Sequence, residues 1–327
     1  MRGIQAILEG DRVELRQLEY AVALAETLHF GQASAKLYIA QSAFSAQIAR
    51  LEKEVGAQLF DRSSNRVAIT AAGELFISRA QEILNQVQEA SRDAASLHSL
   101  RTRQLKVGIF HEAAGELTPL IVHAYQKSYP DVELVFHELN MIDQIDAIVD
   151  GVVDVAFLRA PVNDRRIRLT ALFAEPRFVG LSMHHHLARC DAVTMEDLMD
   201  ESFVLASPQA PSLWRGYWAF DDVRGGPSRV ATTVDRVWES VTAIAYHNAV
   251  DTFPGSATRT HHAPGMVYLP IKDSTYSTSA IAVRSGKLPL HVAAFEKVAT
   301  DLARTSLSAV PGAVPLTEAP QGTPPAV

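Results

Sequence analysis

The chain has 327 residues, a formal net charge of −7 and 47% hydrophobic residues, enough apolar material for two or three cores. It has no apolar run long enough to cross a bilayer, its first fourteen residues lack a secretory pattern, and its lone Cys190 cannot form an internal disulfide. These features exclude a membrane-spanning protein, argue against non-specific coating of nucleic acid, and predict a cytoplasmic location.

Three closely spaced helices are predicted near the amino terminus, after a short extension over residues 1–14. Residues 15–28 carry apolar side chains at spacings of three and four, the pattern of an amphipathic helix. A break at Phe30 precedes a short helix predicted over 32–37, and a third helix is predicted over 41–55. Short helices joined by a tight turn match a helix-turn-helix.

The third predicted helix has two faces of different chemistry. Its apolar stripe, which must be buried, consists of Phe44, Ile48, Leu51 and Val55. The opposite face is small and polar, so the helix can enter the major groove while Gln41, Ser42 and Ser45 hydrogen-bond base edges or phosphates. The helix amino terminus also favours a phosphate anion.

A short hairpin is predicted directly after this helix, because two apolar segments flank the polar stretch 61–66. Arg62 and Arg66 lie in that stretch. Two arginines in an arbitrary turn are usually only solvated. Their position after a helix-turn-helix instead predicts a wing that contacts the DNA backbone or minor groove.

A long helix follows, for which Thr70 can act as the amino-terminal cap. Its apolar seam alternates steps of four and three and consists of Phe76, Ala80, Ile83, Val87, Ala90, Ala94 and Leu97. Such a seam predicts pairing with a partner helix. Packing against its own domain is the alternative, since a short heptad pattern is not specific.

The texture changes after Arg103, where strand-like and helical segments alternate. The predicted strands are 105–110, 132–138, 154–158, 177–182, 203–205, 228–234, 266–270 and 280–284. The predicted helices are 117–128, 141–150, 235–246 and 290–304. We expect an α/β region with mostly parallel sheets, followed by a disordered, proline-rich tail over 306–327.

The first hundred residues resemble the winged helix-turn-helix of the LysR-type transcriptional regulators, most specifically through LEKEVGAQLFDRS followed by ITAAG. The resemblance continues less sharply through YPDVELVF, GVVDVAFLRAP and HHLA. It implies an α/β multidomain protein with a DNA-binding domain (15–72), a dimerising linker helix (73–101) and a two-lobed effector-binding domain (102–305) similar to periplasmic solute-binding proteins. Lobe I would comprise 102–172 and 280–305, and lobe II 173–279.

The recognition helix departs from the family pattern at three positions. Ala40 replaces the usual capping Ser, Ser42 the usual Pro, and Ala46 an Arg that often touches DNA. We therefore predict moderate DNA affinity. The predicted DNA contacts are Gln41, Ser42, Ser45, Gln47, Arg50, Lys53, Arg62 and Arg66.

The resemblance also implies a small-molecule site in a cleft between the lobes. The predicted effector-binding residues are Phe110, His111, Glu112, Arg159, Ser207 and Thr252. Glu112 would repel a carboxylate, although His111 or Arg159 could offset it. We expect a small polar ligand held chiefly by His111, Arg159 and Ser207, each of which could equally be an ordinary loop residue.

The sequence offers little support for other functions. His184 and His186 could at most share an ion, because successive residues of an extended segment face opposite ways, and we predict no metal site and no cofactor. Neither GxSxG nor a Walker loop occurs, so we do not expect an enzyme. A solute-binding protein without DNA activity is the main alternative. The predicted function is a ligand-responsive transcriptional regulator, a homodimer or homotetramer whose expected partners are promoter DNA, a small-molecule effector and RNA polymerase, with no membrane partner.

Overall fold

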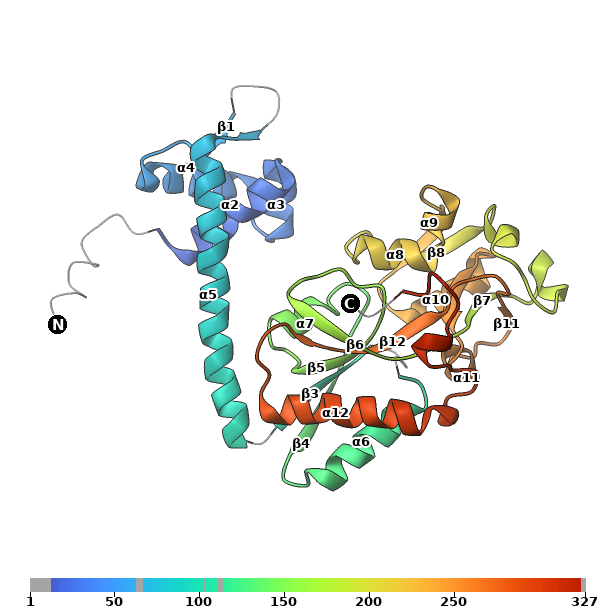
Figure 1. Cartoon of the computed structure of the whole chain (residues 1–327). Helices are drawn as coiled ribbons and strands as arrows, with labels where there is room; N and C mark the ends of the chain where they lie inside the picture. Colours follow the sequence, from blue (N-terminus) through green and yellow to red (C-terminus); the bar gives the residue numbers. More distant parts are fainter. Residues whose placement is uncertain (1–12, 63–66, 103, 111–113, 325–327) are drawn as a thin grey trace. The chain divides into compact units, whose positions relative to one another are not determined.

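The computed structural model describes residues 13–62, 67–102, 104–110 and 114–324, with the backbone alone at 88, 89 and 91–102 (Figure 1). The chain divides into two compact units between Ala95 and Ser96. No helix in these ranges is both long and apolar enough to cross a membrane.

The amino-terminal unit has the order helix, helix, helix, hairpin, helix. Its elements are α2 (Leu15–Thr27), α3 (Phe30–Lys36), α4 (Gln41–Val55), β1 (Phe60–Asp61), β2 (Ala68–Ile69) and α5 (Ala71–Thr102). Strands β1 and β2 pair antiparallel, with Phe60 opposite Ile69. This is a winged helix-turn-helix followed by a long helix, as the sequence predicts.

The core of this unit lies where the three short helices meet. Phe44, Ile48 and Leu51 of α4 are fully buried, whereas Val55 at the end of the predicted stripe is half-buried. The ring of Phe44 packs against Tyr20 of α2 and Phe30 of α3, with centroids 5.5 and 5.9 Å apart. The apolar spacing along α4 therefore fixes which side of the helix stays exposed.

Helix ends in this unit follow local chemistry. Helix α3 begins at Phe30, two residues earlier than predicted, because the His29 ring accepts the amide hydrogens of Gly31 and Gln32. Helix α4 has no side-chain cap at Ala40 and ends at Val55, where Gly56 follows as the carboxy-terminal cap with a φ of 72° that favours glycine.

The start of α5 is held against the end of the wing. The Gly73 N–H donates to the Thr70 hydroxyl over 3.0 Å, which confirms the predicted cap. The Thr70 hydroxyl in turn donates to the Gln58 carbonyl oxygen over 2.7 Å. A Cβ at Gly73 would lie 2.1 Å from the Leu59 carbonyl oxygen, so only glycine permits this approach of helix and chain.

The carboxy-terminal unit contains two lobes (Figure 1). The sheet of lobe I has the order β4–β3–β5–β12–β6. Its strands are β3 (Gln104–Ile109), β4 (Glu133–Glu138), β5 (Val155–Arg159), β6 (Ile167–Glu175) and β12 (Ser277–Arg284). Strands β3, β4 and β5 are parallel, and β12 runs antiparallel to both of its neighbours. Helices α6 (Leu117–Ser128) and α12 (Leu290–Thr305) pack together over one face of it.

Lobe II has two small sheets, one antiparallel (β10–β7–β11) and one parallel (β8–β9). Its strands are β7 (Arg177–Ser182), β8 (Ser202–Ala206), β9 (Arg229–Val234), β10 (Asp251–Pro254) and β11 (Met266–Pro270). The remaining helices of the unit are α7 (Asp146–Val149), α8 (Ser212–Trp218), α9 (Asp221–Arg224), α10 (Val237–His247) and α11 (Ala257–Thr260).

The chain crosses between the lobes twice, at Pro176 and between β11 and β12. Strand β6 continues to Glu175 and β12 already begins at Ser277, so both crossings lie a few residues away from the expected divisions at Phe173 and Ser279. The expectation of mostly parallel sheets does not hold for the first sheet of lobe II, because both strands that pair with β7 run antiparallel to it.

The tail prediction was wrong. Residues 306–324 continue over the surface of the sheets, with short 3-10 helices at Leu307–Ala309 and Leu316–Glu318. Val310 is buried in the lobe I core, and Val314 forms a β-bridge with Ala174. The prolines here separate short turns that pack on lobe I. The proline-rich composition alone therefore wrongly predicted disorder.

Candidate DNA-binding and effector sites

The outer face of α4 carries the predicted DNA contacts at its amino-terminal end. Gln41, Ser42 and Ala46 are exposed, and Ser45 and Gln47 are half-buried. Lys53 is exposed near the other end of the helix. The helix thus offers short polar side chains with a free first turn, the arrangement that close approach to a base edge requires.

Arg50 is engaged by acidic neighbours. Its Nε donates to Glu54 Oε1 over 2.7 Å, while buried Gln17 donates to Glu54 Oε2 over 2.8 Å. The hydrogen bonds from Arg50 and Gln17 lower the pKa of Glu54. Arg50 can therefore contact a phosphate only by sharing or leaving this partner.

Arg62 faces back toward α4. Its guanidinium lies 2.9 Å from Glu52 Oε2 and 4.9 Å from the centre of the Phe30 ring. The other oxygen of Glu52 accepts the amide hydrogens of Leu59 and Phe60, so one carboxylate secures both the turn into the wing and the arginine. A DNA contact by Arg62 must therefore share its guanidinium with Glu52 or replace this pair. Arg66, the second predicted arginine, lies outside the described residues.

The seam predicted along α5 divides into two parts. Phe76 packs against the core of the winged domain, and Ala80 is buried, which agrees with the alternative of packing on the same domain. Farther along, Ile83 and Val87 are 43% and 40% exposed. The seam therefore begins as part of the domain core and continues as an exposed apolar stripe.

A cavity of about 50 Å³ lies where the two lobes meet. Phe110 of lobe I and Trp214 of α8 pack edge to face beside it, with ring centroids 5.5 Å apart. A larger hollow of about 370 Å³ shares Phe110 and Val237 with the first and adds Phe136, His137 and Trp238. The larger volume is in the range of small-molecule pockets.

The predicted effector residues are only partly brought together. Phe110, Arg159 and Thr252 line the smaller cavity. Ser207 is buried, but it does not line either cavity, and its hydroxyl has no hydrogen-bond partner within the described ranges. His111 and Glu112 lie outside the described residues.

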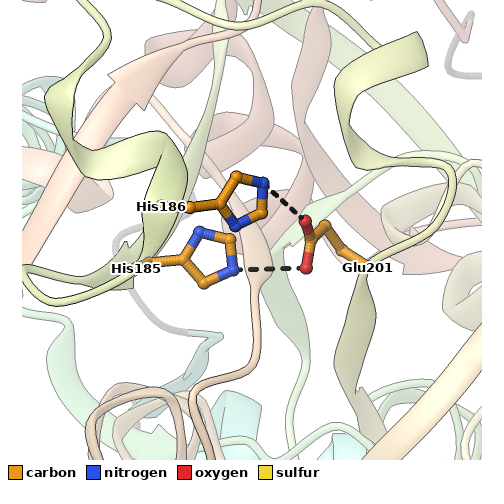
Figure 2. Close-up of side chains that lie close together, drawn as sticks. All are labelled: His185, His186 and Glu201. Carbon is orange, nitrogen blue, oxygen red and sulfur yellow. Dashed lines mark hydrogen bonds and ion pairs between the residues drawn. The ribbon is translucent and has the colours of Figure 1, made fainter.

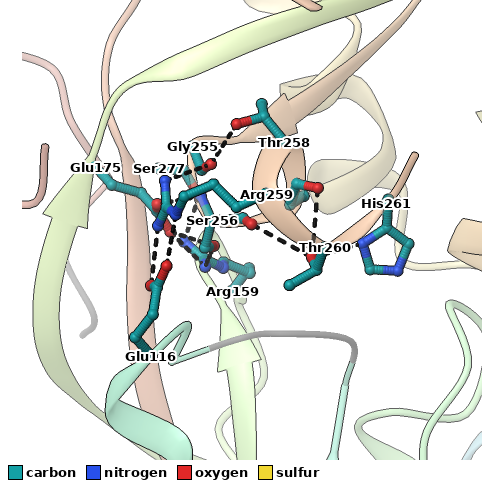
Figure 3. A network of polar contacts seen from close by, with 11 residues as sticks. Glu116, Arg159, Glu175, Gly255, Ser256, Thr258, Arg259, Thr260, His261 and Ser277 are labelled. Carbon is teal, nitrogen blue, oxygen red and sulfur yellow. Dashed lines mark hydrogen bonds and ion pairs between the residues drawn. The ribbon is translucent and has the colours of Figure 1, made fainter. Parts of the chain in front are cut away.

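Arg159 is buried and paired within the protein, and its role as a ligand contact stays a prediction. Its guanidinium lies 2.5 Å from Glu175 Oε1 and donates to the Ser256 hydroxyl over 2.9 Å (Figure 3). Glu175 also accepts the N–H and hydroxyl of Ser256 over 2.6 and 2.8 Å. A buried cation must be compensated, and here the protein supplies the carboxylate itself.

A second ion pair joins the lobes nearby. Arg259 of α11 donates from Nε and Nη2 to the two oxygens of Glu116, the residue before α6, over 2.5 and 2.9 Å (Figure 3). The hydrogen bond from Arg259 lowers the pKa of Glu116. The Glu116–Arg259 pair joins the two lobes directly, whereas Arg159 and Glu175 both lie in lobe I and contact lobe II through Ser256.

Arg177 is a buried group that the sequence reasoning missed. Its guanidinium lies 4.0 Å from the Phe220 ring centre and 4.3 Å from that of Tyr217, and it donates to the Tyr217 carbonyl oxygen over 2.9 Å. Burial lowers its pKa. Burial also raises the pKa of Asp251, in the cavity wall, to about 7, although the positive charge of Arg177 opposes this shift. An arginine opening an otherwise apolar strand was the available signal.

The histidine run is arranged differently from the sequence expectation. His185 and His186, not His184 and His186, turn toward a common partner (Figure 2). Their Nε2 atoms lie 3.2 and 3.4 Å from the two oxygens of Glu201. The chain turns here into a 3-10 helix at His186–Arg189, so the alternation of an extended strand does not apply.

The fold and these sites define a class of protein, a DNA-binding regulator with a two-lobed ligand-binding domain. The family model described as bacterial regulatory helix-turn-helix protein, lysR family, matches residues 15–74, and that of the LysR substrate binding domain matches residues 98–304. The chain therefore belongs to the LysR family of transcriptional regulators.

Individual relatives agree with this assignment. The transcriptional regulator YnfL of Escherichia coli is 33% identical over 258 residues, which are 76% of this chain and 84% of the relative. The regulator BenM of Acinetobacter baylyi is 29% identical over 278 residues, 84% and 90% of the two chains. The crystal structure of full-length BenM aligns with a TM-score of 0.52 at 26% identity, covering 90% of this chain and 97% of that one. The alternative of a solute-binding protein without DNA activity is not favoured.

Proposed function

We propose that this regulator binds promoter DNA in the cytoplasm as a homodimer or homotetramer, and that a small molecule held between the lobes changes how it affects RNA polymerase. In this proposal residues 15–72 bind DNA, 73–101 join subunits and 102–305 bind the effector. The observation that carries the proposal is the exposed polar face of α4, opposite its buried stripe and beside a wing.

Gln41, Ser42, Ser45 and Gln47 contact bases or phosphates in the major groove. Lys53 is exposed and suited to a phosphate, whereas Arg50 and Arg62 must share their guanidinium groups with Glu54 and Glu52 or leave them. Because Arg50 and Arg62 are already paired and position 46 carries Ala in place of Arg, we expect moderate DNA affinity.

Subunits pair through α5. Ile83 and Val87 are exposed at steps that a partner helix would cover, and burying such side chains contributes roughly 1–2 kcal/mol each. Two winged domains held by one dimer match a palindromic site.

The effector occupies the hollow beside Phe110. Its lining combines the aromatic side chains Phe110, Phe136 and Trp238 with the polar side chains His137 and Asn140. A compact ligand with an aromatic or aliphatic body and polar groups at its edge fits this lining.

Ligand binding acts on DNA through the orientation of the lobes. The Glu116–Arg259 ion pair and the hydrogen bonds from Ser256 to Glu175 hold one arrangement of lobe I and lobe II. A ligand that binds another arrangement more tightly shifts the population toward it and changes the spacing of the winged domains.

The test is DNase footprinting on the DNA upstream of the protein's own gene, with and without a library of small metabolites. We expect a discrete protected site with two half-sites whose extent changes with one compound. A variant lacking residues 1–72 serves as the control and should protect nothing. Protection without sequence preference, or equal protection by the truncated variant, contradicts the proposal.

A further inference from the structure

We propose that His185, His186 and Glu201 form a binding site for a divalent transition metal ion on lobe II. The three side chains come from two segments, the turn after β7 and the residue before β8 (Figure 2). Their ligand atoms all lie within 4.8 Å of one another. This site is separate from the interlobe cavity, which none of the three residues lines.

The spacing of the donor atoms suits a tetrahedral ion. Zinc bonds to nitrogen and oxygen are about 2.0–2.1 Å long, so neighbouring ligands of one ion are about 3.3 Å apart. The distances from Glu201 to the two Nε2 atoms are 3.2 and 3.4 Å. The two rings lie with centroids 4.5 Å apart and planes 31° apart, and all three ligand atoms lie within 4.8 Å of one another, so both nitrogens face the region that one ion would occupy.

The residues differ in how firmly they are held. The side chains of His185 and Glu201 are 1% and 17% exposed, whereas that of His186 is 69% exposed. Two ligands are therefore positioned by the fold, and the third closes from solvent. Water can complete the coordination on the open side, as in zinc sites with three protein ligands.

The ligand types select the ion. Two imidazoles and one carboxylate suit zinc, cobalt, nickel or copper, whereas calcium and magnesium prefer sites built wholly of oxygen. One carboxylate also gives the unprotonated site a negative charge, which attracts a divalent cation.

One contact opposes the metal. The Leu187 N–H donates to His185 Nδ1 over 3.3 Å, and a ring that binds metal through Nε2 must carry its proton on Nδ1. The hydrogen bond is at the long end of the normal range, so it is the contact that gives way. Metal binding therefore loosens the start of the 3-10 helix while it joins that helix to β8.

The experiment uses the full chain without an affinity tag, freed of metal, and titrates it with Zn²⁺ against a chromophoric chelator. Co²⁺ absorption in the visible region reports the coordination geometry directly. We expect one saturable site, a higher melting temperature with Zn²⁺ present, and a tetrahedral Co²⁺ spectrum.

The variants His186→Ala and Glu201→Gln should lower the Zn²⁺ affinity by roughly 100-fold or more, since each removes a ligand. His184→Ala is the matched control, because His184 is an exposed neighbour outside the cluster, and its affinity should be unchanged. Cys190→Ser removes the exposed thiol, the other potential metal ligand nearby, and should also leave the Zn²⁺ affinity unchanged. The site is overturned if Zn²⁺ does not saturate one site, or if it binds the wild type and both ligand variants alike.

Discussion

The guanidinium of Arg159 lies 2.5 Å from the carboxylate of Glu175, and the two side chains are 3% and 0% exposed. Arg159 ends β5 and Glu175 ends β6, directly before the chain crosses into lobe II. Because the Ser256 N–H and hydroxyl donate to the same carboxylate, one buried ion pair ties the lobe I sheet to lobe II.

Replacing Glu175 with Gln should destabilise the carboxy-terminal unit by about 3–5 kcal/mol, because a buried guanidinium loses its compensating charge. Urea denaturation followed by fluorescence measures this loss. The control is Asp301→Asn, which breaks the exposed pair with Lys297 and should cost at most about 0.5 kcal/mol. Equal effects of the two substitutions would show that the buried pair contributes no more to the free energy of unfolding than the exposed one.

Asp251→Asn should stabilise the protein at pH 8 and have much less effect at pH 5. Burial raises the pKa of Asp251 to about 7 from an ordinary value near 3.8, so the folded state prefers the protonated carboxyl. The unfolded state loses that proton first as pH rises, and stability attributable to this group falls between about pH 4 and 7. We expect the variant to gain roughly 1–3 kcal/mol at pH 8.

Denaturant midpoints at several pH values measure this effect. Asn keeps an oxygen that can accept the Thr252 N–H, as Asp251 does over 2.7 Å, so the comparison isolates the charge. A difference between variant and wild type that does not change from pH 5 to pH 8 would contradict the raised pKa.

Local periodicity predicted the winged domain well, because each of its helices has one buried stripe set by spacing alone. The predicted strand 177–182 coincides with β7, and the predicted helix 117–128 with α6. Strand β6 and strand β10 were missed, since their burial depends on partners far along the chain and Pro254 is an unusual strand residue. Only Asp146–Val149 of the helix predicted over 141–150 is α-helical.

The candidate sites were less predictable than the fold. Residue type suggested that Arg159 was available to a ligand, but its partner Glu175 is sixteen residues away and is brought to it only by the sheet. Arg62 likewise depends on Glu52. A charged side chain does not reveal in the sequence which partner compensates it, so the ion pairs of Arg159 and Arg62 could not be predicted.

Ile83→Glu should weaken dimerisation roughly 100-fold, because each helix of the symmetric pair then buries a charge in place of an apolar side chain. Sedimentation velocity over a concentration series measures the change. The exposed Gln86 on the same helix offers the control Gln86→Glu, which adds the same charge outside the seam. Unchanged sedimentation of Ile83→Glu would exclude this stripe as the dimer contact.

Ala40→Ser should stabilise the start of α4 by about 1 kcal/mol, because Ala40 has the extended backbone of a cap residue but no side-chain acceptor. Amide hydrogen exchange over the first turn of α4 measures it. Ala43→Ser introduces the same side chain inside the helix and should slightly destabilise it. If Ala40→Ser leaves exchange in the first turn unchanged, another group already satisfies these amides.

Ala46→Arg should raise DNA affinity and make it more salt-dependent. Position 46 is exposed on the face of α4 that carries Ser42 and Ser45, so an added guanidinium there reaches a phosphate. Each new phosphate contact steepens the slope of log K against log salt by about 0.9, hence by about 1.8 for a dimer. Fluorescence anisotropy at several salt concentrations measures the slope. Gln81→Arg adds the same charge on α5 and should leave the slope nearly unchanged. If the two variants give equal slopes, this face of α4 does not contact the DNA.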